Sequence, residues 1–351
     1  GCLMEFVCYT DWDQLPESAN ALFAKGEKES IFFSRLWIEN LANNALNDDQ
    51  VMLLACVVEG DCVLAILPLM KRTRESWSSL SNIYSSLYTL LLAENNQQEV
   101  LTCLAQGLSE LPFKTLRLEP VAENDRNIHS LQQALESFGF YCHRSFHFFN
   151  WIYRLQGQSF EDYMAARPGR VRNTLARKQR KLEREHAYDI RLFTGSNLQQ
   201  ALADYNAIYR VSWKGHELFG GFIESLLRRL SEPGWLRLAI LYIEGQPVAA
   251  QLWFVVHGKA SIFRLAYDED WKNYSPGSIL TSYLMQHVIE TDNVEEIDFL
   301  MGNDRYKQEW MSECRKRCRL VCVNKHKPKG RAHLFAASLK DLLRRLKGQA
   351  A

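Results

Sequence analysis

Two residues near the C-terminal end of the chain have the chemistry needed for proton transfer. Asp298 ends an apolar, strand-like segment, and Tyr306 opens the helix expected after Gly302. Desolvation raises the basicity of a carboxylate, so Asp298 is the first candidate for a general base. A phenol is neutral at pH 7 and can donate a proton. Each residue also has a structural interpretation: Asp298 would accept backbone hydrogen bonds from the next loop, and Tyr306 would cap the domain edge.

A third candidate for proton transfer is His216, in the segment Trp213–Glu217. Among side chains, imidazole has the ordinary pKa closest to neutrality, so His216 is an alternative base to Asp298. A single histidine in a glycine-containing loop is also typical of an exposed surface residue. The choice of base therefore stays open.

An anion-binding site is predicted at Ser275-Pro276-Gly277-Ser278, where a helix is expected to begin. The first amides of a helix have no intrahelical acceptor, and the helix dipole favours negative charge there. Gly277 and Ser278 would therefore present amides to a diphosphate, Pro276 suits the first helical turn, and Lys272 would add a cation. Alternatively, the Pro-Gly pair only turns the chain into the helix.

These candidates need a scaffold, and the sequence predicts one that occurs twice. Apolar strands flank a tight turn at 51–67 around Gly60 and again at 237–254 around Gly245. After each hairpin a third strand, a helix and a further strand follow, expected at 81–92, 97–111 and 115–120, and at 260–267, 278–291 and 296–300. We therefore predict an α/β protein with mixed α+β sheets and a duplicated domain.

Length and composition agree with two soluble domains. The 351 residues fit two cores of about 150 residues, which we place at 1–155 and 156–330, with an amphipathic helix at 331–351. This last helix would dock back or mediate a homodimer. The net charge of +1 gives no global field toward nucleic acid or anionic lipid. Without a long apolar run or a signal peptide, and with nine scattered cysteines, we expect no membrane span and a reducing cytoplasm.

No metal site is expected. Cys314, Cys318 and Cys322 recur every four residues, as on one face of a helix, but lack Cys-x-x-Cys pairing or histidine partners. We expect them to pack. The chain also lacks a Gly-x-Ser-x-Gly elbow and a Walker-type loop, which disfavours hydrolysis and phosphoryl transfer.

Residues 167–184 predict a cationic helix between the two halves. This stretch has eight basic residues and one acidic residue. Arg177 and Arg180 are candidates for binding an anionic substrate, although such a run is also typical of a solvated face. One side can pack through an apolar stripe made of Val171, Leu175 and Leu182.

Four segments, at 167–184, 244–250, 267–277 and 297–310, together make the second half of the chain resemble the GNAT superfamily of acyltransferases. Within it the likeness is greatest to the CelD/BcsL branch, which shares a tandem arrangement with FemAB-like transferases; the first half resembles a degenerate copy. Where the family has Gln/Arg-x-x-Gly-x-Gly/Ala, this chain has Ser275-Pro276-Gly277-Ser278. The segments that carry the resemblance are the cationic helix at 167–184, Glu244–Ala250, Tyr267–Gly277, and Ile297–Gly302 followed by Tyr306, Lys307 and Trp310.

The resemblance implies an N-acyltransferase that uses acetyl-CoA or another acyl-CoA. The acceptor would be an amine of a small molecule or of an envelope or exopolysaccharide precursor. Tyr306 would protonate the leaving thiolate. The strand at 261–267 would splay from its neighbour and offer a backbone N–H to the thioester carbonyl. Trp213 would lie on the acceptor side.

Four more residues are expected near the acceptor. Arg264 and Lys307 would bind an anionic group or remain solvated cations, and Gln251 and Tyr267 would line the cleft or belong to the core. Two other functions stay open. One is transfer from an aminoacyl-tRNA, as in FemAB-like proteins, and the other is non-catalytic binding of an anionic polymer through the cationic helix and the cluster at 315–317.

Overall fold

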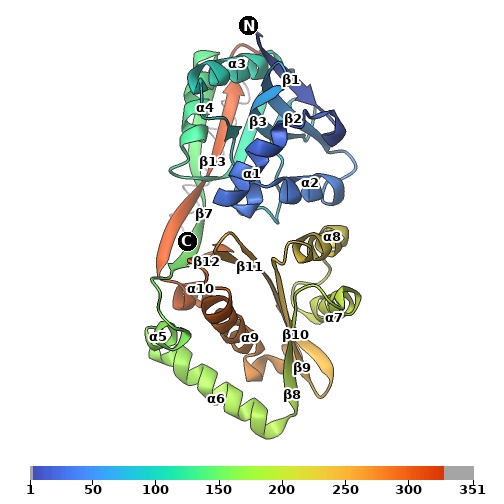
Figure 1. The fold of residues 1–351 in the computed structure, drawn as a ribbon, viewed down its shortest axis with the longest axis vertical. Coiled ribbons are helices and arrows are strands. Elements are labelled where there is room, and N and C mark those ends of the chain that lie inside the picture. The colour runs from blue at the N-terminus through green and yellow to red at the C-terminus, as the bar shows by residue number, and fades with distance from the viewer. Residues whose placement is uncertain (1–2, 328–351) are drawn as a thin grey trace, which may run out of the picture. The chain divides into compact units, whose positions relative to one another are not determined.

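The computed structural model describes residues 3–327, which form two compact units (Figure 1). Unit 1 contains the residues up to His147 and those from Lys316 onward, and unit 2 contains Phe148–Arg315. The helix predicted at 331–351 lies outside the described residues. Among the described helices, none combines the length and the apolar character needed to cross a bilayer.

The division differs from the predicted boundaries at 155/156 and 330. Two long strands, β7 (Phe140–Arg154) and β13 (Glu313–Asn324), each begin in one unit and end in the other. The last strand of unit 1 therefore comes from the C-terminal part of the chain, because β13 pairs antiparallel with β6 (Thr115–Ala122). Unit 1 is thus discontinuous in sequence, whereas unit 2 is continuous.

Unit 1 is built on a sheet with the strand order β1-β2-β3-β4-β6-β13, followed by the first part of β7. Helix α3 packs on β1 to β3, and its Leu104 and Leu108 are fully buried together with Leu67 of β3. The further elements of this unit are β1 (Met4–Tyr9), η1 (Trp12–Gln14), α1 (Ala19–Glu29), η2 (Ile31–Phe33), α2 (Arg35–Asn44), β2 (Val51–Glu59), β3 (Cys62–Lys71), β4 (Ser76–Ser79), β5 (Leu91–Leu92), α3 (Gln97–Glu110) and α4 (Arg126–Ser137).

Unit 2 has the strand order β7-β12-β11-β10-β9-β8, with α7 and α8 on one face of the sheet and α9 on the other (Figure 1). Trp253 and Leu280 are fully buried between the sheet and α9. The elements are α5 (Phe160–Ala165), α6 (Gly169–Glu185), β8 (Tyr188–Phe193), α7 (Leu198–Val211), α8 (Gly220–Ser231), β9 (Leu236–Ile243), β10 (Gln246–Val256), β11 (Lys259–Tyr267), η3 (Glu269–Tyr274), α9 (Pro276–Gln286), η4 (His287–Thr291), β12 (Glu296–Met301) and α10 (Arg305–Trp310).

The predicted repeat is present in the strand pairing. Both hairpins form, β2 with β3 and β9 with β10, each antiparallel. In both units the strand after the hairpin pairs in parallel with the strand that follows the helix, β4 with β6 and β11 with β12. The two units therefore share one order of strands and helices around their central crossover.

Two sequence predictions about local structure are wrong. Residues 81–90 form no strand, although Tyr84, Tyr88 and Leu90 are buried; the strand that pairs with β6 is β4, just before them. The segment with Cys314, Cys318 and Cys322 is strand β13 and not a helix, and Cys314 is exposed whereas the other two cysteines are buried as expected. A spacing of four residues fits both structures, because residues four apart share a face in a strand as well as in a helix.

Candidate active site

Strand β11 separates from β12 soon after the two strands begin to pair. Their last parallel pair is Ser261 with Asp298, whereas β11 continues beside β10 as far as Tyr267. At this point the β10–β11 register shifts, leaving Phe263 as an extra residue in β11. Such a bulge bends a strand and increases its twist. The edge of β11 beyond Ser261 consequently pairs with no strand in the described part of the chain.

Helix α9 begins beside this separation with amides directed outward. Ser275 precedes the helix in a left-handed conformation (φ 50°) and makes no side-chain cap, and Pro276 occupies the first turn. Because proline has no N–H, the first amides available to an external acceptor are those of Gly277 and Ser278. The space where a Gly277 side chain would project is open. The helix start thus has both the donors and the room that an anion needs.

The cationic helix α6 packs beside this helix start through two lysines. Lys178 Nζ lies 2.5 Å from the Asn273 carbonyl oxygen, and Lys181 Nζ lies 4.7 Å from the centre of the Tyr274 ring. The pKa of Lys178 is lowered, first by desolvation and then by the neighbouring Arg177 and Lys181 charges. Positive charge therefore gathers next to η3 and α9.

Three other basic residues expected at the site, Arg177 and Arg180 of α6 and Lys272 of η3, are exposed. The helix period indicates which basic residue of α6 faces the domain. Lys178 follows Val171 by seven residues, so both lie on the face that packs against the domain.

Gln251 and Tyr306 meet α9 from two sides in a buried polar network. Gln251 is 1% exposed, and its Nε2 donates to the Gly277 carbonyl oxygen and to Thr281 Oγ1, each at 2.9 Å. Thr281 Oγ1 lies 2.5 Å from the Tyr306 hydroxyl oxygen. Burial raises the pKa of Tyr306 to about 12, with the nearby polar side chains of Thr281, Ser278 and Gln251 acting in the opposite direction. Gln251 therefore supports α9 and Tyr306 and has almost no surface with which to line a cleft.

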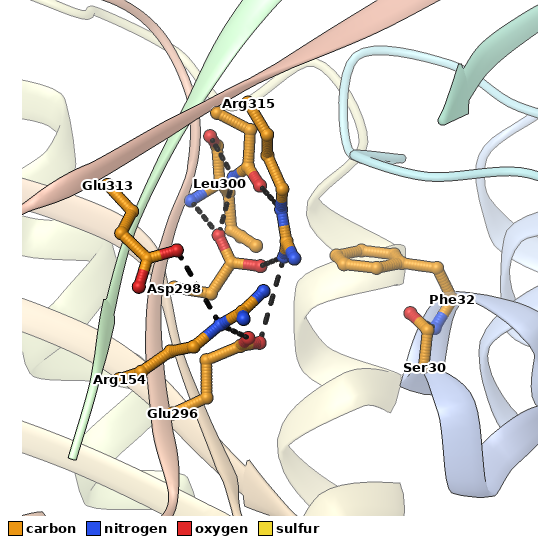
Figure 2. Close-up of polar contacts among 9 residues, drawn as sticks. Ser30, Phe32, Arg154, Glu296, Asp298, Leu300, Glu313 and Arg315 are labelled. Atoms are coloured by element: carbon orange, nitrogen blue, oxygen red, sulfur yellow. Dashed lines mark hydrogen bonds and ion pairs between the residues drawn. The ribbon is translucent and has the colours of Figure 1, made fainter. Parts of the chain in front are cut away.

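Asp298 is held by neighbours on β7, β12 and β13 (Figure 2). Its Oδ1 accepts from Asn150 Nδ2 at 2.6 Å and from the Leu300 backbone N–H at 2.7 Å, while Oδ2 lies 3.4 Å from an Arg315 nitrogen. Asn150 also donates to the Leu300 carbonyl oxygen and accepts from Arg315. This arrangement corresponds to the structural alternative considered for Asp298, a carboxylate that fixes the following backbone.

The backbone that Asp298 fixes is strained. Leu300 is 5% exposed and has φ 60°, a left-handed conformation that leucine rarely adopts. Such strain persists only where surrounding contacts impose it, and here Asp298 and Asn150 hold both polar groups of the Leu300 residue. Beyond it, Gly302 (φ 129°) leaves room for the Lys307 ammonium, which bonds to the Met301 carbonyl oxygen. Burial lowers the pKa of Lys307, opposed by Asp304 and Asp298.

On the opposite face of the sheet from α9, Arg264 of β11 forms an ion pair that sequence analysis missed. One of its terminal nitrogens lies 2.7 Å from both carboxylate oxygens of Glu217 and 2.7 Å from the Tyr209 hydroxyl oxygen. The Glu217 side chain is only 7% exposed. Arg264 is 55 residues from Tyr209 and 47 from Glu217 in the sequence, so only the fold brings it to them.

A cavity of about 410 Å³ lies against this ion pair. Exposed His216 is one of its lining residues, whereas Trp213 projects to solvent and is 68% exposed. Between them, Lys214 is half-buried, and its pKa is lowered to about 8 by desolvation and then by the Arg264 charge. The cavity is lined by Ala203, Asn206, Tyr209, Arg210, His216 and Glu217.

The predicted residues thus do not form a single cluster. Ser278 and Tyr306 meet at the start of α9, while His216 and Arg264 lie at the α7 side of the sheet around Glu217. Tyr267 ends β11 and packs partly buried against the core. No cluster of three or more potential metal-ligating side chains occurs among residues 3–327.

Comparison with known proteins agrees with this geometry. Residues 169–308 match the family model described as an acetyltransferase (GNAT) domain. No curated protein matches the sequence significantly. Among solved structures, FemX is similar over 87% of this chain and 96% of its own, with 10% identity and a TM-score of 0.61.

Two further structures show the same fold over most of both chains. The C-terminal domain of a putative lysylphosphatidylglycerol synthetase from Agrobacterium fabrum has 11% identity and a TM-score of 0.56, covering 93% of this chain and 96% of its own. A tandem GNAT protein from the clavulanic acid biosynthesis pathway has 12% identity and a TM-score of 0.54, covering 93% and 99%. The described residues therefore have the fold that these solved structures share, a tandem GNAT protein among them, and residues 169–308 are similar to a GNAT acetyltransferase domain.

Proposed function

We propose that the chain is an N-acyltransferase that moves an acyl group from an acyl-CoA thioester to an amine where β11 and β12 separate. The main supporting observation is the end of their pairing at Ser261 and Asp298, next to the bulge at Phe263. The open edge of β11 offers backbone donors, and the start of α9 flanks the same opening. Acetyl-CoA or a longer acyl-CoA would be a co-substrate.

The residues on the α9 side suit the donor. The amides of Gly277 and Ser278 would hold the diphosphate, with Lys178 of α6 as a nearby cation. A backbone N–H of β11 would polarise the thioester carbonyl. Tyr306 would give its proton to the leaving thiolate, since its raised pKa keeps it protonated at neutral pH.

The residues on the α7 side suit an amine acceptor. The cavity beside Glu217 would admit it, and Arg264 and Lys214, together with Lys307 of α10, would favour an acceptor that carries an anionic group. We propose His216 as the base that takes the amine proton, because it is exposed at this cavity while Asp298 is engaged by its neighbours. Amines of small molecules and of envelope or exopolysaccharide precursors, as in a CelD/BcsL-like enzyme, are the acceptors to test first.

Calorimetry with coenzyme A and acetyl-CoA tests the donor. Binding in the micromolar range, followed by thiol release with a panel of amines, is the expected result; no binding of any acyl-CoA would exclude the proposal. Tyr306→Phe should lower kcat by about 10²-fold or more with little change in donor KM. A non-catalytic polymer-binding module would instead keep its function when both Asp298 and Tyr306 are replaced.

A second donor, aminoacyl-tRNA, is favoured by one observation. The outer face of α6 exposes Arg172, Arg177 and Arg180 while Leu175 and Leu182 are buried beneath it. If this face binds RNA, affinity for tRNA should fall steeply with salt and weaken in Arg177→Ala/Arg180→Ala. The exposed Arg126→Ala in unit 1 is the control. Weak, salt-independent tRNA binding would exclude this donor.

A further inference from the structure

Four side chains form one continuous line of hydrogen bonds from β10 through α9 to α10. Trp253 Nε1 donates to Gln251 Oε1 at 2.9 Å, Gln251 Nε2 contacts Thr281 Oγ1 at 2.9 Å, and Thr281 Oγ1 contacts the Tyr306 hydroxyl at 2.5 Å. Trp253, Gln251 and Thr281 are each at most 1% exposed. Water therefore does not compete for the bonds among these three residues, and their polar groups are satisfied by protein neighbours.

The indole of Trp253, at one end of this line, determines which atoms of the next residues donate and which accept. The Trp253 indole nitrogen can only donate, so the Gln251 oxygen must accept and the Gln251 nitrogen must face Thr281. That nitrogen has two protons, one for the Gly277 carbonyl oxygen and one for Thr281 Oγ1. The Thr281 oxygen is thus an acceptor toward Gln251.

The single proton of Thr281 then has two possible acceptors. One is the Tyr306 oxygen at 2.5 Å, and the other is Gln251 Oε1 at 3.3 Å. The second contact is longer, and Gln251 Oε1 already accepts from Trp253. The shorter contact is the better placed for the Thr281 proton, and with Thr281 as the donor the Tyr306 proton is left for an external acceptor.

We propose that Thr281 is a positioning residue that donates its proton to the Tyr306 oxygen, so that the phenol proton is directed to the leaving thiolate. This inference rests on the proposed acyl transfer. In the step, the Tyr306 O–H bond breaks, an S–H bond forms on the thiolate, and the electron pair stays on the phenolate oxygen. The Thr281 hydroxyl stabilises that phenolate until water returns a proton.

Kinetics of Thr281→Val, which removes the hydroxyl and keeps the shape, test this role. We expect kcat to fall about tenfold while the KM of the acyl donor is unchanged, and Thr281→Ser to restore the rate. In a Tyr306→Phe background Thr281→Val should have no further effect. The neighbouring buried hydroxyl on α9, Ser282→Ala, is the matched control. Additive losses from Thr281→Val and Tyr306→Phe, or no rescue by serine, would overturn the proposal.

A measurement without turnover separates this inference from the proposed function. Replacing Tyr306 by 3,5-difluorotyrosine places a ¹⁹F probe on a phenol that ionises at lower pH. Thr281→Val should raise the phenol pKa by about one or more, because a hydrogen bond to the charged form is lost. An unchanged titration contradicts the hydrogen-bond direction. If the titration moves but the wild-type protein transfers no acyl group, the hydrogen-bond direction stands and the proposed function, with the catalytic role, is refuted.

Discussion

Replacing Gly277 by Asp separates anion binding at the start of α9 from the stability of that helix. A side chain at this position meets nothing within 4 Å, and Gly277 is not among the glycines with positive φ. An acid in the first turn interacts favourably with the helix dipole, by about 0.3–1 kcal/mol. Removing a helical glycine also adds some stability. We therefore expect an unchanged or higher melting temperature.

The same carboxylate should weaken binding of a diphosphate held by the Gly277 and Ser278 amides. Two like charges about 5 Å apart repel by about 1–3 kcal/mol for an effective dielectric constant between that of water and about 20. This corresponds to an increase of about 5- to 150-fold in Kd. Gly277→Asp should therefore keep or raise the melting temperature while it weakens coenzyme A binding. A variant that simply misfolds would lose both.

Calorimetry with coenzyme A at low and high salt, alongside thermal unfolding, measures both effects. Gly277→Asn is the matched control, since asparagine has the same shape without the charge and should keep near wild-type affinity. The loss in Gly277→Asp should shrink as salt rises. If Gly277→Asp binds coenzyme A as tightly as the control does, the diphosphate does not lie at this helix start, and the assignment is refuted.

Three further predictions concern other parts of the chain. Arg237 and Asp292 form a largely buried ion pair with bonds of 3.0 and 2.8 Å. Asp292→Ala should therefore lower the free energy of unfolding, measured in urea, by about 3–5 kcal/mol. Asp189→Asn, which removes the charge from an exposed ion pair, should change it little. The Lys214 pKa of about 8 in the folded protein lies below its ordinary value of 10.5. Between these two pH values the unfolded state binds more protons than the folded state, so the free energy of unfolding should rise with pH. Lys214→Met should remove that rise. The Cys142 and Cys322 sulfurs are 2.9 Å apart, so oxidised glutathione should remove both thiols, as seen by mass spectrometry, while Cys142→Ser should prevent the crosslink.

Periodicity and turn residues were enough to predict most of the fold, because they act over short distances in the chain. The two hairpins around Gly60 and Gly245, and the helices that follow, form where expected. Burial alone misled the prediction at 81–90, where apolar side chains are buried but the backbone joins no strand. An apolar sequence pattern predicts which side chains are buried, whereas a strand is defined by backbone pairing with another strand.

The site was less accessible from sequence, since its contacts join distant residues. Nothing near Asp298 indicates that Asn150 and Arg315 will occupy its carboxylate, and nothing near Arg264 indicates Glu217. Thr281 lies in an apolar helix, and nothing in the sequence around it indicates the contact with Tyr306. Such pairings depend on topology, which local patterns do not encode.

The division of the chain also affects the order in which the units can fold during synthesis. Domains usually fold as they emerge, the N-terminal one first. Here unit 1 lacks strand β13 until the residues after Lys316 have been made, whereas every residue of unit 2 is available once Arg315 has left the ribosome. The unit that begins later is therefore the first that can complete its sheet, and the earlier unit must wait with the β6 edge open to other partners.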